Sequence, residues 1–115
     1  MRYLLPAVMT LMPLLAFSEV VPEAADAASG KAVYAQTCIA CHGANGKGTI
    51  PGVVDFTAED GPLSKSSAEL IKNISEGFQN SGSFMAMPPK GGNPALTEIE
   101  VRAVLAYLRS EFGKK

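Results

Sequence analysis

The sequence predicts an all-α fold in which three main helices are joined by long loops. Residues 29–42, 66–77 and 97–113 carry the apolar spacing and the terminal residues of helices. Glycine and proline gather between them, and no stretch shows convincing strand alternation, although residues 52–57 are compatible with a short extended piece. A chain of 115 residues without internal repeats is long enough for one domain.

The N-terminus has the pattern of an export signal. Arg2 supplies a positive start, and an apolar run follows over residues 3–17. The run is shorter than the roughly 20 apolar residues of a membrane span, so we predict a signal peptide over residues 1–18, with cleavage as late as residue 27. An uncleaved anchor is the alternative. Residues 19–28 are expected to form a flexible leader, and the mature protein is expected in the periplasm.

The charge balance excludes one class of partner. The full sequence has a formal net charge of −1, and cleavage after residue 18 or after residue 27 would leave the net charge close to zero. No basic stripe is present, so we expect no nucleic-acid partner. Export also places the two cysteines in a compartment where disulfides are usual.

The first helix is expected to begin near Ser29, which can cap it, and to end around Cys41 and His42, before a glycine-rich stretch. One face of this helix carries Val33, Tyr34, Thr37 and Cys38.

The second helix is expected at residues 66–77. Ser66 and Glu69 have the spacing of a capping box, and Gly77 is suited to a left-handed C-terminus. Its apolar stripe consists of Leu70, Ile71 and Ile74.

The third helix is expected at residues 97–113, where Thr97 and Glu100 repeat the capping box. Three such helices cannot build a thick core around long loops, so we expect a large apolar prosthetic group to complete the interior. The broad apolar face of this helix holds Ile99, Val101, Ala103, Val104, Leu105, Tyr107 and Leu108.

Both cysteines and the only histidine of the chain stand within five positions, as Cys38, Cys41 and His42. A redox-active pair of the thioredoxin type lies at the start of a helix after a strand, whereas this motif ends a helix. A closed zinc site needs four ligands, and the chain has three cysteines and histidines in all. C-x-x-C-H is the attachment motif of c-type haem. We therefore predict one covalently attached haem c, with thioether bonds from both cysteines and His42 as the proximal iron ligand.

With this motif the chain resembles the monohaem class I cytochromes c, of the short bacterial periplasmic type. Residues 30–48 look like the N-terminal helix and haem loop of that family, and residues 87–110 look like its methionine loop and C-terminal helix. The resemblance covers residues 29–113, which we take as the cytochrome c domain. It implies an all-α fold wrapped around one haem, with the N- and C-terminal helices crossing. The small and aromatic residues of that crossing match Gly30, Tyr34 and Tyr107.

The resemblance also implies a haem pocket. A backbone carbonyl after the haem motif, which we assign to Pro51, is expected to accept a hydrogen bond from the His42 imidazole. Tyr34 and Phe56 are assigned to the same pocket. Further candidates for its wall are Leu63, Leu70, Ile74, Phe78, Phe84 and Leu105.

The second axial ligand cannot be another histidine of this chain, which leaves methionine, lysine, another donor, water or nothing. Two methionines remain after export, Met85 and Met87, in the loop where the class I family has its thioether ligand. We predict Met87, with Met85 as the runner-up, because the residue before a proline is held extended and Met87 precedes Pro88. Its surroundings also match the Met-Pro motif of the family more closely. Lys90 is a third candidate.

Methionine and histidine ligation predicts a single-electron carrier rather than an enzyme, with iron cycling between Fe(II) and Fe(III). Expected partners are redox proteins (a dehydrogenase, an oxidase or a reductase), with membrane contact only transient or through a partner, and the protein is expected to be a monomer. One alternative is the haem subunit of a larger oxidoreductase, and a less favoured one is a ligand-binding or peroxidase-like haem protein. Candidate docking charges, each equally compatible with a plain surface role, are Lys47, Lys65, Lys72 and Lys90.

Overall fold

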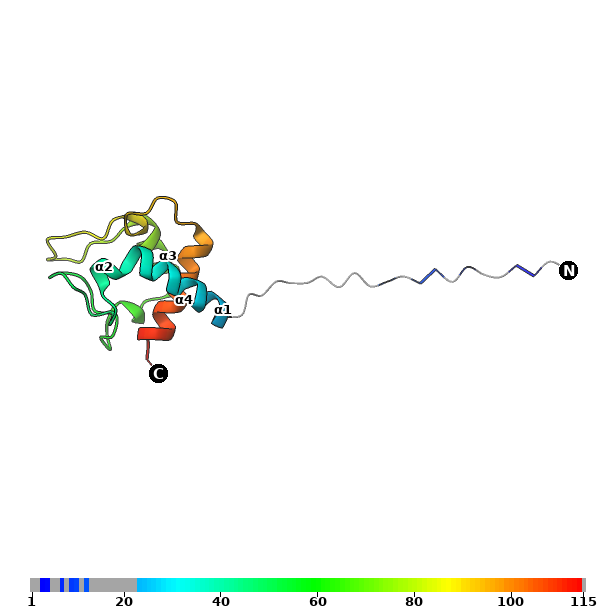
Figure 1. Cartoon of the computed structure of the whole chain (residues 1–115), viewed down its shortest axis with the longest axis horizontal. Helices are drawn as coiled ribbons and strands as arrows, with labels where there is room; N and C mark the ends of the chain where they lie inside the picture. Colours follow the sequence, from blue (N-terminus) through cyan, green and yellow to red (C-terminus); the bar gives the residue numbers. More distant parts are fainter. Residues whose placement is uncertain (1–2, 5–6, 8, 11, 13–22, 115) are drawn as a thin grey trace.

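The computed structural model describes residues 3–4, 7, 9–10, 12 and 23–114. The predicted signal peptide and residues 19–22 of the predicted leader fall largely outside these described residues. From residue 23 onward the chain is helical with long loops, as predicted (Figure 1). Among the described residues, no helix has the length and apolar character that crossing a membrane requires.

The first helical segment consists of α1 (Glu23–Val33), a π-helical turn η1 (Tyr34–Cys38) and α2 (Ile39–His42). The prediction that it begins near Ser29 was wrong, because residues 23–28 are already helical. Four of these six residues are alanine, the strongest helix former, so propensity rather than apolar spacing sets the start. The segment ends at His42 as predicted, where Gly43 takes a φ of 81°.

The π-helical turn η1 inserts one residue into the helix and ends at the first cysteine, Cys38. Its wider ring is closed by a hydrogen bond from the Ile39 N–H to the Tyr34 carbonyl. π-Helical turns of this kind occur often at functional sites. No residue type in the sequence indicates this turn.

The other two helices lie where the sequence predicts them. Helix α3 (Ser67–Glu76) is capped by Ser66, whose hydroxyl accepts from the Glu69 N–H at 3.2 Å. Helix α4 (Glu98–Phe112) has a complete capping box between Thr97 and Glu100. Two short 3-10 turns lie in the loops, η2 (Pro62–Ser64) and η3 (Pro89–Gly92).

The crossing of α1 on α4 forms the first half of the core (Figure 1). A Cβ atom on Gly30 would lie 2.0 Å from the Ala103 carbonyl oxygen, so only glycine permits this approach. The Tyr34 ring packs beside Tyr107 and Phe112, with ring centroids 5.3 and 5.6 Å away. The predicted crossing and its small and aromatic residues are confirmed.

One residue of the predicted apolar face was wrong. Ile99 is 77% exposed, whereas Val101 and Val104 are fully buried. Residues two positions apart on an α-helix differ by about 200° of rotation, so Ile99 points away from the core when Val101 faces it. Hydrophobicity alone could not separate these positions.

The loops gather at the end of the molecule that carries the cysteines. Residues 43–55 and 79–88 extend to the same side, at the left of Figure 1. Residues 52–57 form turns and irregular structure rather than the extended piece that the sequence allowed. Among the described residues the one β-bridge joins Phe78 and Met87 in antiparallel fashion.

We expect Gly30→Ala to destabilise the protein by about 1–3 kcal/mol, because the new methyl group meets rigid backbone on α4. Denaturant unfolding measures this change. The control is Ser29→Ala, an exposed neighbour on the same helix, which should change stability by less than about 0.5 kcal/mol. Equal stability of the two variants would show that the close approach is not required.

Candidate functional site

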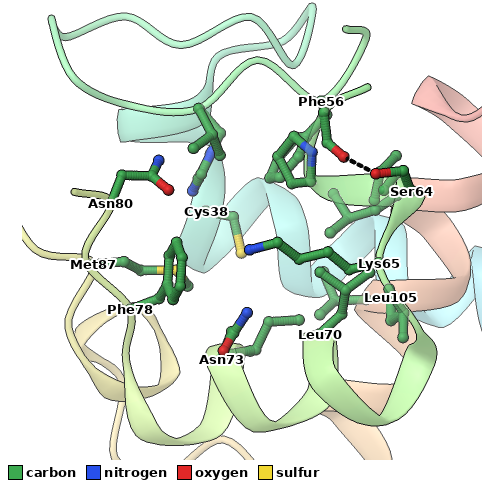
Figure 2. Close-up of a pocket in the computed structure, with 18 of the residues that line it drawn as sticks. Cys38, Phe56, Ser64, Lys65, Leu70, Asn73, Phe78, Asn80, Met87 and Leu105 are labelled. Carbon is green, nitrogen blue, oxygen red and sulfur yellow. Dashed lines mark hydrogen bonds between the residues drawn. The ribbon is translucent and has the colours of Figure 1, made fainter. Parts of the chain in front are cut away.

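An apolar cavity of about 330 Å³ lies between α2, α3, α4 and the loops that follow α2 and α3 (Figure 2). Its size is in the range of cavities that bind small molecules and cofactors. A smaller cavity of about 120 Å³ adjoins it and is bounded by Cys41 and Met85. Both cavities are lined by Cys38, His42, Val54, Phe78, Asn80 and Met87.

His42 closes one wall of these cavities. It is 7% exposed, and its ring stacks on Phe56 with a centroid separation of 4.5 Å. Burial lowers the pKa of the imidazole, so the ring is neutral and keeps a lone pair for a metal. Its Nδ1 is buried and has no hydrogen-bond partner among the described residues. The hydrogen bond to the Pro51 carbonyl, which the sequence predicted, is therefore absent from this structure.

The backbone around His42 is held by hydrogen bonds from the loop that follows. The Gly48 N–H donates to the His42 carbonyl at 2.8 Å, and the Thr49 N–H donates to the Cys41 carbonyl at 2.9 Å. The buried Tyr34 hydroxyl donates to the Gly43 carbonyl at 2.5 Å. These bonds satisfy the backbone carbonyls at the end of α2 and hold the backbone at His42 in place.

The two cysteines are free and differ in exposure. Cys38 is half-buried and lines both cavities, whereas Cys41 is exposed and borders the smaller cavity. Burial, and then the nearby Cys41, raises the pKa of the Cys38 thiol to about 11. Redox-active cysteines have lowered pKa values, so Cys38 lacks the electrostatics of a reactive thiol. No cluster of three or more histidine, cysteine or acidic residues among those described is arranged to hold a metal, and the zinc alternative gains no support.

Met87 is fixed by the β-bridge with Phe78. The Met87 N–H donates to the Phe78 carbonyl at 2.7 Å, and the Phe78 N–H donates back at 3.1 Å. Gly77 permits this pairing, because a Cβ there would lie 2.8 Å from the Met87 carbonyl oxygen. Its φ is 88° as expected, but its ψ of 164° is extended rather than left-handed helical.

The structure separates the two candidate methionines. Met87 is half-buried and lines both cavities, which it shares with His42. Met85 is 39% exposed and borders only the smaller cavity. The contacts of Met85 are local, since Ser83 Oγ donates to its carbonyl at 2.9 Å.

Several residues assigned to the pocket lie elsewhere. Tyr34 lines neither cavity, because its ring is packed in the crossing of α1 and α4. Pro51 is exposed at a turn, and Phe84 is 73% exposed on a loop. The larger cavity is lined by the other predicted wall residues, Phe56, Leu63, Leu70, Ile74, Phe78 and Leu105.

Several residues of the cavity wall were not predicted from the sequence. Val104 and Leu108 continue the apolar stripe of Leu105 and could have been found from helical spacing. Lys65, Asn73 and Asn80 also line the cavity, but polar residues give no periodic signal that would place them there.

The donor set at these cavities fits a covalently bound haem. Two thiols, one imidazole and the thioethers of Met85 and Met87 border these apolar spaces, and thiols, an imidazole and a thioether are the groups that attach a c-type haem and ligate its iron. The buried Nδ1 of His42 also has no hydrogen-bond partner among the described residues.

Comparison with known proteins gives the same result. The family model of cytochrome c matches residues 27–111. The chain is 37% identical over 83 residues to cytochrome c-555 of Chlorobaculum thiosulfatiphilum, covering 72% of this chain and 93% of that protein. It is 35% identical over 88 residues to cytochrome c-555 of Prosthecochloris aestuarii, covering 75% and 88%. It is also 31% identical over 93 residues to the cbb3-type cytochrome c oxidase subunit CcoP of Rhodobacter capsulatus, covering 77% of this chain and 30% of that protein.

We expect Tyr34→Phe to destabilise the protein by about 0.5–1.5 kcal/mol, because it removes a buried hydrogen bond and leaves the Gly43 carbonyl with only the longer bond from the Gly46 N–H, at 3.3 Å. Burial raises the pKa of Tyr34 to about 12, so the hydroxyl remains a donor at every pH suitable for the measurement. Thermal or denaturant unfolding tests this.

The matched control is Tyr107→Phe. This ring packs in the same crossing, but its hydroxyl makes no hydrogen bond to another described residue. The control should change stability by less than about 0.5 kcal/mol. If both substitutions cost the same, the Tyr34 hydroxyl has no role in holding the end of α2.

Proposed function

The chain belongs to the cytochrome c family of electron carriers, and from this premise we propose that His42 and Met87 are the axial ligands of its one covalent haem and that it works as a free periplasmic carrier. The observation that carries the proposal is that Cys38, His42 and Met87 line the same two cavities. Cys41, one helical turn from Cys38, supplies the second covalent attachment. Redox proteins are the partners of such a carrier.

The bound haem supplies an iron that gains and loses one electron. The neutral imidazole of His42 holds a lone pair for that iron, and the thioether of Met87 favours the ferrous state. With His42 and Met87 both bound to the iron, no open position would be left for a substrate.

The chain favours rapid electron transfer because both donors have fixed backbones. His42 ends a helix whose last carbonyls accept hydrogen bonds from the following loop. The N–H and the carbonyl of Met87 are both hydrogen-bonded to the backbone of Phe78. Apolar residues of α3 and α4, including Leu70 and Leu105, exclude water from the space between the donors. A site held in this way changes little in geometry when the charge of the iron changes.

Export to the periplasm rests on the N-terminal sequence. The apolar run over residues 3–17 follows a basic residue and is interrupted by Ser18 and Glu19. Mass spectrometry of the mature protein from the native host gives its N-terminus and tests the cleavage directly.

A second function is favoured by the similarity to the oxidase subunit. In this alternative the domain is the haem subunit of a larger oxidoreductase rather than a free carrier. Since the chain covers 30% of that subunit, the similarity reaches only part of it. Native purification distinguishes the two, because a subunit elutes with its partners and a free carrier elutes alone.

We expect Met87→Ala to abolish the weak red absorption band of methionine-to-iron ligation in the oxidised protein, because Met87 shares the cavities with His42. Met85→Ala, the matched control two residues away, should keep the band because its side chain is partly exposed.

Carbon monoxide binding to the reduced protein gives a second measurement. The unmodified protein and Met85→Ala should bind it poorly, and Met87→Ala should bind it readily. If the unmodified protein lacks the band and binds carbon monoxide, the ligand-binding or peroxidase-like alternative replaces the electron carrier. If Met85→Ala loses the band instead, the axial ligand is Met85.

A further inference from the structure

Lys65 places a positive charge in the apolar cavity. Its ammonium lies over the Phe78 ring, 4.1 Å from the ring centroid. Figure 2 shows the side chain extending across the cavity from the segment before α3, with its nitrogen toward the middle of the space. From the sequence we expected only a surface or docking role for this lysine, so its position is a finding of the structure.

The backbone that carries Lys65 is anchored to α4. The Arg109 guanidinium donates to the Leu63 carbonyl and to the Lys65 carbonyl, each at 3.1 Å, and to the Ser67 hydroxyl at 3.3 Å. This clamp fixes the position from which the lysine side chain starts. Its flexible four-carbon stem can still direct the charge along the cavity wall.

No carboxylate neutralises this charge. Lys65 forms no ion pair with any described residue. It is the only lysine or arginine that lines either cavity, and the one acidic residue there, Asp60, is exposed. The other titratable groups of the larger cavity are Cys38 and His42. The cation–π contact with Phe78 supplies only part of what an ammonium loses on leaving water.

We propose that Lys65 binds a propionate of the haem and thereby raises its reduction potential. This rests on the haem-bearing function proposed above. A haem carries two propionates on the edge remote from its vinyl groups, and the vinyl edge is fixed here by Cys38 and Cys41. A carboxylate enclosed by apolar walls is stable only with a cation or several donors. Lys65 is the one cation available in the cavity, and the Asn73 and Asn80 amides are further donors on its wall.

The effect on the potential follows from the charge. Oxidation adds one positive charge at the iron, which a bare propionate stabilises and a propionate neutralised by Lys65 does not. Removing the lysine therefore favours the ferric protein.

The test is a redox titration of the haem-loaded protein against a reference couple at fixed pH and low salt. Lys65→Gln should shift the electron-exchange equilibrium about tenfold toward the oxidised protein. Lys65→Arg keeps the charge. It should shift the electron-exchange equilibrium constant by less than half of the Lys65→Gln shift, measured on a logarithmic scale. Lys72→Gln removes an exposed charge from α3 that lines neither cavity, and should shift it less than about twofold.

Two outcomes would overturn the proposal: equal shifts for Lys65→Gln and Lys72→Gln, or no shift for Lys65→Gln. If Lys65→Gln does not accumulate, Lys65→Met repeats the titration with the apolar stem retained. Resonance Raman spectra add a direct readout, because the propionate bending modes should move in Lys65→Gln and not in Lys72→Gln. Failure of the proposed function has a different signature, since the unmodified protein would then retain no covalent haem.

Discussion

The apolar cavity beside His42 is the constraint on which the rest of this structure depends. Half of the core is ordinary helix packing, where α1 meets α4 at Gly30. The other half is a wall of apolar side chains from α3, α4 and two loops, which face a space of about 330 Å³ rather than one another. Protein interiors are close-packed, so in so small a domain these walls require a bound group to complete them. A covalent haem meets that requirement and performs the chemistry at the same time.

The two halves of the core are joined by a row of aromatic rings. Phe112, at the end of α4, packs 5.6 Å from Tyr34 in the helix crossing and 5.9 Å from Phe56, and Phe56 stacks on His42. The Phe112 ring also lies against Gly46, where a Cβ would be 2.8 Å from the ring. Helix packing therefore positions His42, the proposed proximal ligand, as well as stabilising the domain.

The features that the sequence predicted well are those with a local physical cause. The Thr97–Glu100 capping box needs residues three apart, and the C-x-x-C-H motif needs five consecutive positions. The helix start at Glu23, the π-helical turn and the exposure of Ile99 depend on propensity and packing that apolar spacing does not report. Placing Lys65 in the cavity required the tertiary structure, because the clamp from Arg109 joins residues more than 40 positions apart.

Amide hydrogen exchange tests most directly whether the haem completes the core. The haem-loaded protein is compared with a Cys38→Ala/Cys41→Ala double variant prepared without haem. We expect the backbone amides of Val104, Leu105 and Leu108, the α4 residues that line the cavity, to be strongly protected in the haem-loaded protein and to lose most of that protection in the double variant. Equal protection in both would contradict this expectation, because the side chains alone would then form a stable interior.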